Sequence, residues 1–387
     1  MDASETGGSF TREAIEKFYG TPFTEGNRVT LLWKEKESFH TIFEFIENAK
    51  ELVCLEFYIF RNDETGNKLS EILKRKAFEG VKIYILYDHF GSFGTPIKFW
   101  KSLKQAGVHI RASRPFKWTD PFHYVYRDHK KLIIVDGVLA FTGGLNIANE
   151  YRGYHRIRRI KGWRDTGIFL KGPIAKTLLE IFIKSWEIWK GTPIHHNISP
   201  QPLSDDIPVI PIFASSSRGR RKMRKLLYYS IAQAQKCIYL TTAYFTPSRR
   251  MIVILEEAVF RGVSVKLLLP GRSDVTAAHY AGRASFTKLL KAGVEIYNYQ
   301  GEILHAKTSV FDGIWSVIGS ANLDFQSLRR NDEGNVGIVD KNFGMQMIEI
   351  FNEDLRQSEQ IILDTWVKRP FWEKVKEQFF ALFRRRL

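Results

Sequence analysis

The sequence predicts an α/β fold of two similar lobes, each a mostly parallel sheet flanked by helices, with the active site between the lobes. Three observations predict it. Helix-spaced apolar residues alternate with short apolar runs, both halves of the 387 residues show the same order of elements, and one polar motif occurs once in each half. The period is far longer than that of common repeat units, so it indicates two lobes and not a solenoid.

The first half alternates helical and strand patterns. Residues 39–50 carry apolar side chains at helix spacing, and the run V-C-L-E-F-Y-I-F, which ends at Phe60, predicts a buried strand. A second helix ends at Gly80 before V-K-I-Y-I-L-Y, and a third ends at Gly107 before V-H-I. Glycine after a helix-spaced segment is a common stop signal, so these are helix–strand units.

The second half repeats this order. A helix leads to C-I-Y-L-T-T-A-Y-F, which ends at Phe245, and a second helix ends at Gly262 before V-S-V-K-L-L-L. A third helix ends at Gly293 before V-E-I-Y. The segments A-F-E-G-V-K-I and V-F-R-G-V-S-V are the clearest pair, and they indicate two lobes of the same design.

The predicted boundaries follow from composition. A linker rich in polar residues and proline at 196–206 separates a first lobe, 27–195, from a second lobe, 207–355. An N-terminal extension, 1–26, precedes them, and a basic amphipathic tail, 356–387, follows. The tail places Phe371, Val375, Phe379 and Leu382 at helix spacing. Such a helix either lies in a membrane interface or packs on the body of the protein, and the sequence leaves both open.

Charge limits the partner class. The chain has 58 Lys and Arg against 42 Asp and Glu, a formal net charge of +16. Such a balance favours an anionic partner, either nucleic acid or an anionic membrane surface. The 44% of hydrophobic residues exclude global disorder. No apolar stretch approaches 18 residues, and the polar start of the chain does not resemble a secretory signal, so we expect a peripheral protein.

The two cysteines, Cys54 and Cys237, lie in apolar runs and are expected to be reduced thiols. No Cys and His cluster has metal-ligand spacing, so we expect neither a metal nor another cofactor.

The chemistry is concentrated in the duplicated motif. H-K-K-L-I-I-V-D places His129, Lys131 and Asp136, and six residues later G-G-L-N follows. H-A-K-T-S-V-F-D places His305 and Lys307 before an Asp, and after the same interval G-S-A-N follows. One H-x-K carries no signal, but two copies of a long spaced pattern at matching places are highly specific. The remaining motif residues are Gly143, Gly144, Asn146, Asp312, Gly319, Ser320 and Asn322.

The spacing indicates phosphoryl chemistry. Side chains alternate along a strand, so each His and Lys of H-x-K share one face. Two facing units bring together two imidazoles and two ammonium groups, so that one His attacks phosphorus and the other protonates the leaving alcohol. The lysines stabilise the developing negative charge in place of a metal. We expect Asn146, Asn322, Ser320 and Gly144 to bind phosphate oxygens.

The doubled H-x-K-x4-D-x6-G-[GS]-x-N pattern resembles that of the phospholipase D superfamily. Over most of residues 27–340 the flanking segments are similar to bacterial cardiolipin synthases, especially to the shorter forms without N-terminal transmembrane helices; these segments are G-N-R-V-T-L-L, A-Y-F-T-P and N-D-E-G-N. The resemblance implies a phosphohistidine intermediate and a carboxylate after each motif that orients a catalytic His. Glu333 lies eleven residues after Asn322, whereas the same offset in the first half gives Ile157, so Asp165 in G-W-R-D-T-G is the nearest candidate there. In the superfamily the motif acids corresponding to Asp136 and Asp312 support the fold.

The resemblance implies a cardiolipin synthase that joins two phosphatidylglycerol molecules at the cytoplasmic side of the bacterial cytoplasmic membrane. His129 is the expected nucleophile and His305 the expected acid and base. A hydrolase of the same superfamily, either a phospholipase D or a nuclease, is the alternative, and a non-catalytic membrane scaffold is a third reading that two intact motifs disfavour. The sequence leaves the acceptor alcohol and the oligomeric state open.

Overall fold

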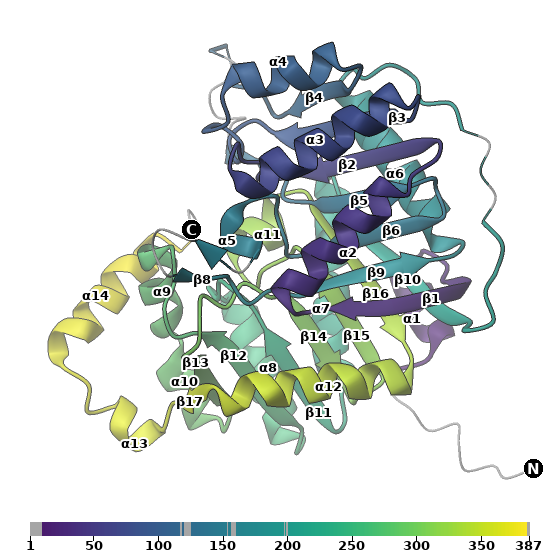
Figure 1. Cartoon of the computed structure of the whole chain (residues 1–387). Helices are drawn as coiled ribbons and strands as arrows, with labels where there is room; N and C mark the ends of the chain where they lie inside the picture. Colours follow the sequence, from purple (N-terminus) through teal and green to yellow (C-terminus); the bar gives the residue numbers. More distant parts are fainter. Residues whose placement is uncertain are drawn as a thin grey trace, which may run out of the picture.

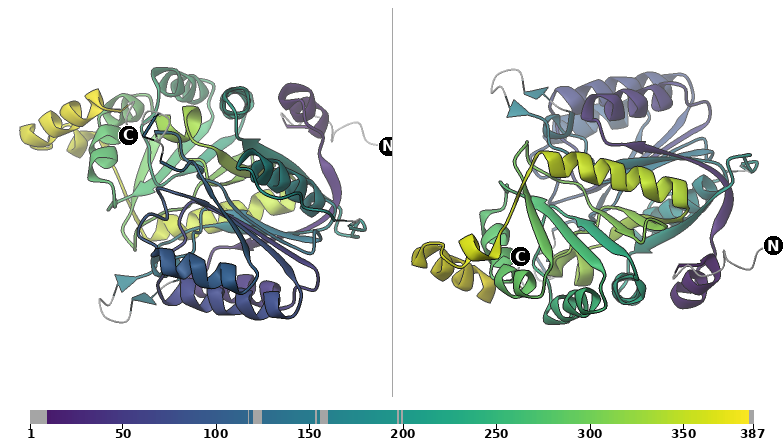
Figure 2. Two further views of the ribbon diagram at one scale, coloured as in Figure 1. Left: turned by 90° about the horizontal axis from the view of Figure 1, so that it is seen from above. Right: turned by 90° about the horizontal axis from the view of Figure 1, so that it is seen from below.

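The computed structural model describes residues 10–116, 118–119, 125–152, 154–155, 160–196, 198 and 200–384. It has one large sheet with helices on both faces, which confirms the α/β class (Figure 1). Figure 2 shows the helices of the two halves on opposite outer sides, with further helices between them.

The first lobe contains seven strands of the large sheet. Its elements are β1 (Thr24–Leu32), α2 (Glu35–Glu47), β2 (Leu52–Phe57), α3 (Glu64–Phe78), β3 (Lys82–Asp88), α4 (Ile97–Gln105), β4 (His109–Ser113), β5 (Lys131–Val135), β6 (Leu139–Gly143), α5 (Asn149–Arg152), β9 (Gly167–Lys171) and α6 (Ile174–Ile188). A separate small hairpin, β7 (Tyr154–His155) and β8 (Ile160–Lys161), lies between α5 and β9.

The second lobe repeats this series. Its elements are β10 (Ile207–Ala214), α7 (Ser217–Gln233), β11 (Cys237–Thr241), α8 (Arg249–Phe260), β12 (Ser264–Pro270), α9 (Thr276–Arg283), α10 (Phe286–Lys291), β13 (Glu295–Tyr299), β14 (Thr308–Phe311), β15 (Trp315–Gly319), α11 (Phe325–Arg329), β16 (Glu333–Val339) and α12 (Lys341–Arg356). The predicted linker, 196–206, ends where β10 begins.

The two lobes have the same strand order. It runs β1-β9-β6-β5-β2-β3-β4 in the first and β10-β16-β15-β14-β11-β12-β13 in the second. The antiparallel pairing of β1 with β10 joins the two halves into one sheet. The duplication predicted from the sequence is therefore a duplication of topology.

The expectation of mostly parallel sheets is wrong. Among the described strands, the parallel pairs are β2–β3, β3–β4, β11–β12 and β12–β13, and the other pairings are antiparallel. The helix–strand alternation that predicted parallel pairing covers only β2 to β4 and β11 to β13. The motif strands β5 and β6 form a hairpin, as do β14 and β15, and a short turn can connect only antiparallel strands.

The three largest of four apolar clusters form most of the core, and alternation along the strands divides the side chains among them. In β5, Ile133 and Val135 pack under α2 and α3, whereas Leu132 and Ile134 face a central cluster. The central cluster also takes side chains from α6 and α12, the two helices between the lobes in Figure 2. A third cluster packs α7 and α8 on the second lobe. Burial on both faces explains why the motif strands are continuous apolar runs.

The motif acids Asp136 and Asp312 hold the turns that follow the motif strands. Asp136 accepts hydrogen bonds from the backbone N–H groups of residues 50–52, at the start of β2. Asp312 does the same for residues 235–237, at the start of β11. Both acids have positive φ angles, +50° and +55°, a conformation that Asp tolerates better than most residues. Their carboxylates therefore tie each motif hairpin to the neighbouring strand.

Both terminal segments differ from the predicted boundaries. Residues 1–9 of the predicted extension lie outside the described residues, but Phe10 and, from α1 (Arg12–Tyr19), Ile15 and Tyr19 are buried in the core of the second lobe. In the predicted tail, β17 (Ser358–Gln360) pairs with β13 and extends the sheet. The N-terminal segment and the start of the tail are thus parts of the second lobe.

The last helices, α13 (Leu363–Trp366) and α14 (Phe371–Leu382), lie at the side of the second lobe (Figure 1). Glu377 of α14 is fully buried and accepts hydrogen bonds from Arg283 of α9 and from Arg369. Phe371 and Leu382, in contrast, are 70% and 78% exposed. The helix therefore packs on the body through a charged face and leaves its apolar face open. No helix in the described part of the chain is long and apolar enough to cross a membrane.

Candidate active site

The two motif histidines lie at the starts of equivalent strands. His129 comes two residues before Lys131, the first residue of β5, and His305 comes shortly before β14. All four His and Lys side chains of the motifs are buried. Each lysine turns back to its own histidine: Lys131 Nζ donates to the carbonyl of His129 at 2.7 Å, and Lys307 Nζ donates to the carbonyl of His305.

The backbone of each histidine is bonded to the opposite lobe. His129 N–H donates to the Asp332 carbonyl at 2.8 Å, and His305 N–H donates to the Arg164 carbonyl at 2.7 Å. Asp332 and Arg164 come immediately before Glu333 and Asp165, the two candidate carboxylates. These bonds align each histidine with the acid of the other lobe.

The carboxylates meet the histidines across the lobe boundary. Nδ1 of His129 lies 3.0 Å from Oε2 of Glu333, and Nδ1 of His305 lies 2.6 Å from Oδ2 of Asp165. A carboxylate at Nδ1 favours the tautomer with the proton on that nitrogen and leaves Nε2 with a lone pair. Each complete His–carboxylate pair therefore needs both lobes.

Sheet register explains why the two acids follow their motifs at different distances. Gly143 of β6 pairs with Gly167 of β9, and Gly319 of β15 pairs with Asn335 of β16. Asp165 and Glu333 each come two residues before the paired residue. In the first lobe, the chain between Asn146 and Asp165 contains α5 and the β7–β8 hairpin. This insertion moves the acid along the sequence without moving it in the sheet.

Burial sets the charge state of the histidines. It lowers the pKa of His305 to about 3, and repulsion from Lys307 and Lys131 adds to this. Burial also lowers the pKa of His129, against the attraction of Glu333. Both imidazoles are therefore neutral near pH 7 in the free protein, the form in which a ring nitrogen can act as a nucleophile.

The lysines are also desolvated. Burial lowers the pKa of Lys131 to about 7 and that of Lys307 to about 8. Burial alone would raise the pKa of Asp165, but Lys307 and His305 lower it, so this carboxylate stays ionised. An anion bound between the lysines would favour their charged forms, because it supplies the opposite charge that burial has removed.

The second positions of the Gly-rich turns contact the carboxylates. A Cβ on Gly144 would lie 2.0 Å from Oδ1 of Asp165, so only glycine leaves room for this acid. Ser320, at the equivalent position, donates its hydroxyl to Glu333. The N–H groups of Gly144 and Ser320 donate to the carbonyls of Thr166 and Gly334, both at 3.0 Å. These donors therefore hold the acids and their strands, and binding of phosphate by the two turns stays a prediction.

The side chains of both motif asparagines are buried. Asn146 accepts from the N–H of Ile59 and donates one amide hydrogen to the Tyr151 hydroxyl, so its second amide hydrogen can serve a phosphate oxygen. The side-chain oxygen of Asn322 lies 3.3 Å from the Thr242 hydroxyl. Binding of phosphate by the two amides stays a prediction.

A family model described as "Cardiolipin synthase, PLD-like domain" matches residues 42–184 and 227–355, which together contain both motifs and both carboxylates. The chain belongs to this cardiolipin synthase family of phospholipase D-like proteins. The two matched segments fall in the two lobes, so the family's repeated domain corresponds to the repeated strand order.

Curated relatives agree with the family. Cardiolipin synthase A of Pseudomonas putida (strain GB-1) is 33% identical over 363 residues, which cover 93% of this chain and 75% of the relative. Cardiolipin synthase of Geobacillus sp. (strain WCH70) is 33% identical over 370 residues, which cover 94% of this chain and 73% of the relative. Both matches extend over nearly the whole chain and not only over the motifs.

A solved structure shares the fold. The phosphatidylserine synthase of Haemophilus influenzae Rd KW20 superposes with a TM-score of 0.75, covering 97% of this chain and 100% of that chain, at 14% sequence identity. At this identity the likeness concerns the fold alone, and it includes both lobes.

Aromatic residues near the two His–carboxylate pairs were missed by the sequence reasoning. The Tyr58 ring lies 4.9 Å from the imidazole of His129, centroid to centroid, and Tyr244 lies 6.4 Å from that of His305. Tyr58 follows β2, and Tyr244 follows the equivalent strand β11. Tyr151 and Trp163 also contact the His305 ring, at 5.3 and 5.2 Å. An aromatic residue follows the equivalent strand in each half of the sequence, and this repetition could have identified Tyr58 and Tyr244.

Buried ion pairs support the backbone next to both histidines, and the pair of Arg164 was missed by the sequence reasoning. Arg164 forms a two-pronged pair with Asp354 of α12, with both contacts below 3.0 Å. Lys130, between His129 and Lys131, donates to Glu56 at 2.6 Å. Removing one member of such a pair leaves a buried charge without a partner, which typically costs about 3–5 kcal/mol. These residues therefore act on the histidines through the position of the backbone.

The described residues contain no group of three or more His, Cys, Asp or Glu side chains that could hold a metal ion. The positive groups beside the two histidines are the side chains of Lys131 and Lys307.

Proposed function

We propose that this chain is a cardiolipin synthase that transfers a phosphatidyl group from one phosphatidylglycerol to a hydroxyl of a second, with release of glycerol. One observation carries the proposal: two buried His–carboxylate pairs, each completed across the lobe boundary beside a lysine, in a member of the cardiolipin synthase family. The names of the curated relatives support the choice of reaction.

In the first half-reaction, Nε2 of neutral His129 attacks phosphorus and forms an N–P bond. The P–O bond to glycerol breaks, and the departing oxygen takes a proton from Nε2 of His305. We assign the attack to His129 because Glu333 is the side chain bonded to its Nδ1. Nδ1 of His305 lies 2.6 Å from Asp165 and also 2.6 Å from the ammonium group of Lys307. Before this step His305 takes up a proton from solvent at Nε2 as the substrate binds, because the negative charge of the phosphodiester offsets the repulsion from Lys307 and raises the pKa of His305.

In the second half-reaction, a hydroxyl of another phosphatidylglycerol transfers its proton to His305 as its oxygen attacks phosphorus. The N–P bond breaks, the new P–O bond completes cardiolipin, and His129 and His305 return to their starting forms. Lys131 and Lys307 stabilise the negative charge on the non-bridging oxygens, where it grows in the transition state. Asn146 and Asn322 add amide hydrogen bonds.

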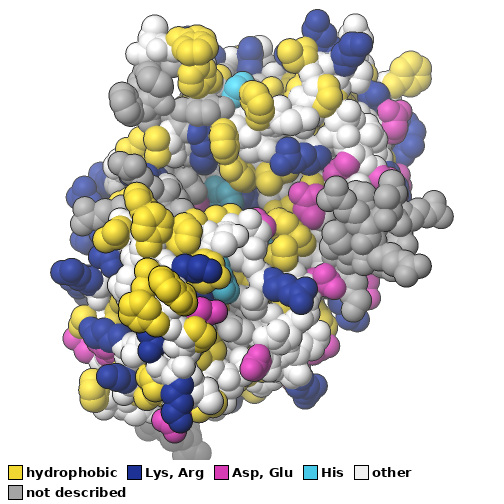
Figure 3. Space-filling view, turned by 90° about the vertical axis from the view of Figure 1, so that its left-hand side faces the viewer, with side chains coloured by type: hydrophobic (Ala, Val, Ile, Leu, Met, Phe, Trp, Pro, Cys, Tyr) yellow, Lys and Arg dark blue, Asp and Glu magenta, His cyan; other side chains and the backbone are white. Residues whose placement is uncertain are grey.

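We further propose that the protein works at an anionic membrane surface, on the cytoplasmic side of a bacterial cytoplasmic membrane. The side of the molecule that carries α14 displays hydrophobic side chains together with Lys and Arg, and it is hollowed between the lobes (Figure 3). Apolar side chains next to basic ones suit the boundary between acyl chains and anionic headgroups.

Product analysis tests the reaction. The protein is incubated with pure phosphatidylglycerol, and the lipids are separated by thin-layer chromatography beside a parallel gel with single-stranded DNA. Cardiolipin and glycerol are expected. Phosphatidic acid without cardiolipin would indicate a phospholipase D, and cleavage of DNA without any lipid product would indicate a nuclease.

Substitution of the histidines tests the mechanism. His129→Ala and His305→Ala should each lower the rate by at least about 10²-fold, since one imidazole cannot serve both sides of an in-line displacement. Quenching during turnover of phosphate-labelled lipid should trap an acid-labile, base-stable adduct on His129. Label on His305 alone would reverse the two roles, and absence of label under every quench would argue for direct displacement.

A further inference from the structure

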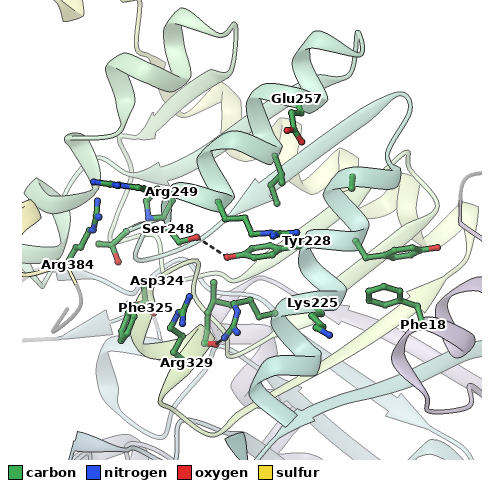
Figure 4. A pocket seen from close by; sticks show the side chains of 18 residues that line it. Phe18, Lys225, Tyr228, Ser248, Arg249, Glu257, Asp324, Phe325, Arg329 and Arg384 are labelled. Carbon is green, nitrogen blue, oxygen red and sulfur yellow. Dashed lines mark hydrogen bonds between the residues drawn. The ribbon is translucent and has the colours of Figure 1, made fainter. Parts of the chain in front are cut away.

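A basic groove lies on the second lobe, apart from the catalytic pairs (Figure 4). It has a volume of about 1150 Å³, and its walls come from α7, the start of α8 and α11, with Phe18 of α1 at its edge. Neither motif histidine and neither motif lysine is among the described residues that line it. The groove is therefore a separate candidate site.

Positive charge dominates the lining of this groove. Two acids, Glu257 and Asp324, also line it, and burial raises the pKa of Asp324 to about 7, which weakens its negative charge. Within the described part of the chain, none of the groove cations forms an ion pair with a carboxylate. These cations are Arg224, Lys225, Arg249, Arg250, Arg329 and Arg384.

The positions of the arginines oppose the stability of the protein. Arg249 and Arg250 are the first two residues of α8, directly after its N-cap Ser248. Cations at a helix N-terminus are repelled by the helix dipole. Burial and then repulsion from Arg329 lower the pKa of Arg224. A bound anion would relieve both conflicts.

The groove also offers aromatic and apolar surface. Phe18 stacks on Tyr229 with centroids 4.1 Å apart, and the Tyr228 hydroxyl lies 2.9 Å from that of Ser248. Figure 4 shows Arg249 and Arg384 at one end of the groove. Arg384 follows α14, the helix whose apolar face is exposed. Arg384 therefore connects the groove to the end of a helix that exposes apolar surface suited to acyl chains.

We propose that this groove binds the phosphodiester headgroup of an anionic phospholipid in the membrane, as a second lipid site beside the catalytic cleft. Six cations that form no ion pair within the described residues match a phosphate-bearing ligand, and the neighbouring apolar face of α14 favours a lipid over nucleic acid. Asp324 connects the two sites, since it lines the groove and lies two residues after Asn322. Binding here does not depend on which reaction the histidines catalyse.

Vesicle sedimentation with the full-length protein tests this site. The groove variant carries Arg249→Ala, Arg250→Ala and Arg329→Ala, three exposed side chains. The matched control carries Lys98→Ala, Lys101→Ala and Lys104→Ala, three exposed cations of α4 on the first lobe. With vesicles of phosphatidylglycerol and phosphatidylcholine, the groove variant should bind at least about tenfold more weakly than the wild type, and the control less than about threefold.

The melting temperature separates loss of the site from loss of the fold. Because Arg249 and Arg250 oppose the dipole of α8, the groove variant should melt no lower than the control. Equal weakening of vesicle binding in both variants would overturn the proposal, since diffuse charge would then explain the binding.

Two further probes separate the sources of the anion. Thermal stabilisation of the wild type by short-chain phosphatidylglycerol should exceed that by inorganic phosphate, and the excess should be smaller in the groove variant than in the control. Equal stabilisation by inorganic phosphate would overturn the lipid assignment. If the groove variant loses affinity for single-stranded DNA but keeps its vesicle affinity, the groove binds nucleic acid and the proposal is wrong.

Discussion

Glu333, the first residue of β16 in the second lobe, holds Nδ1 of His129 in the first lobe at 3.0 Å. Asp165 of the first lobe makes the equivalent contact with Nδ1 of His305 in the second lobe, at 2.6 Å. Neither lobe alone contains a complete His–carboxylate pair. Relative movement of the lobes would therefore disturb the carboxylate contacts of both histidines at once.

Removing the charge of either acid should reduce turnover more than substrate binding. Glu333→Gln and Asp165→Asn keep the shape of the side chains but no longer favour the reactive tautomer of the histidine. We expect kcat to fall by at least about 10²-fold, while KM changes little. Steady-state kinetics measure both constants, and Glu353→Gln, at an exposed site on α12, is the control. A raised KM with an unchanged kcat would contradict a positioning role for the acids.

The reaction should not require a divalent metal. Lys131 and Lys307 are buried beside the histidines and supply the positive charge that a metal supplies in other phosphoryl-transfer enzymes. Activity should therefore survive EDTA in a metal-free buffer. Loss of activity on chelation, with recovery on adding Mg²⁺ or Zn²⁺, would refute this role of the lysines.

Binding of substrate should weaken as the pH rises. The pKa of Lys131 is about 7 and that of Lys307 is about 8, so the free site loses positive charge between pH 6 and 9. A phosphodiester keeps its single negative charge over this range, and it binds the protonated lysines better. KM for short-chain phosphatidylglycerol should therefore rise with pH across this window. Lys131→Arg should flatten the lower part of the profile, because an arginine remains charged. A constant KM would show that the lysines are already protonated in the free protein.

The exposed apolar face of α14 should contribute to membrane binding. Replacing Phe371, Phe379 and Leu382 by serine should weaken binding to phosphatidylglycerol vesicles, while the Glu377 contacts keep the helix attached to α9. The matched control replaces three exposed apolar residues elsewhere, Phe78, Ile188 and Phe260.

Binding should also be absent with purely zwitterionic vesicles and should weaken at high salt, because exposed charges are screened. Deleting residues 371–387 is a coarser form of the same experiment. If both serine variants bind vesicles as the wild type does, the face of α14 has no role in anchoring.

Much of the site was predictable because its signals are local. The positions of His129 and Lys131 follow from an H-x-K pattern at the start of an apolar strand, and the second copy at His305 and Lys307 made the assignment specific. The α/β class and the two lobes follow from the order of helices and strands, which occurs once in each half of the sequence. Local periodicity and a duplicated motif survive in the sequence whatever the distant contacts are.

Pairing between distant segments was decided only by the tertiary structure. The helix–strand alternation predicted parallel sheets, but the direction of β5 and β6 depends on a hairpin whose partners lie elsewhere in the sheet. The exchange of Glu333 and Asp165 between lobes depends on how β1 and β10 join the two halves. No local pattern encodes such pairings.

The packing of α14 was likewise predictable from the sequence only in part. Its helical spacing was visible in the sequence, but a helix with both an apolar and a charged face can bury either one. The buried pairs of Glu377 with Arg283 and Arg369 decide that the charged face packs on α9. The sequence by itself determined the residues of the duplicated motif and their spacing, because those depend on neighbours along the chain. The tertiary structure alone decided which residues meet, because that depends on the free energy of contacts between segments far apart in the chain.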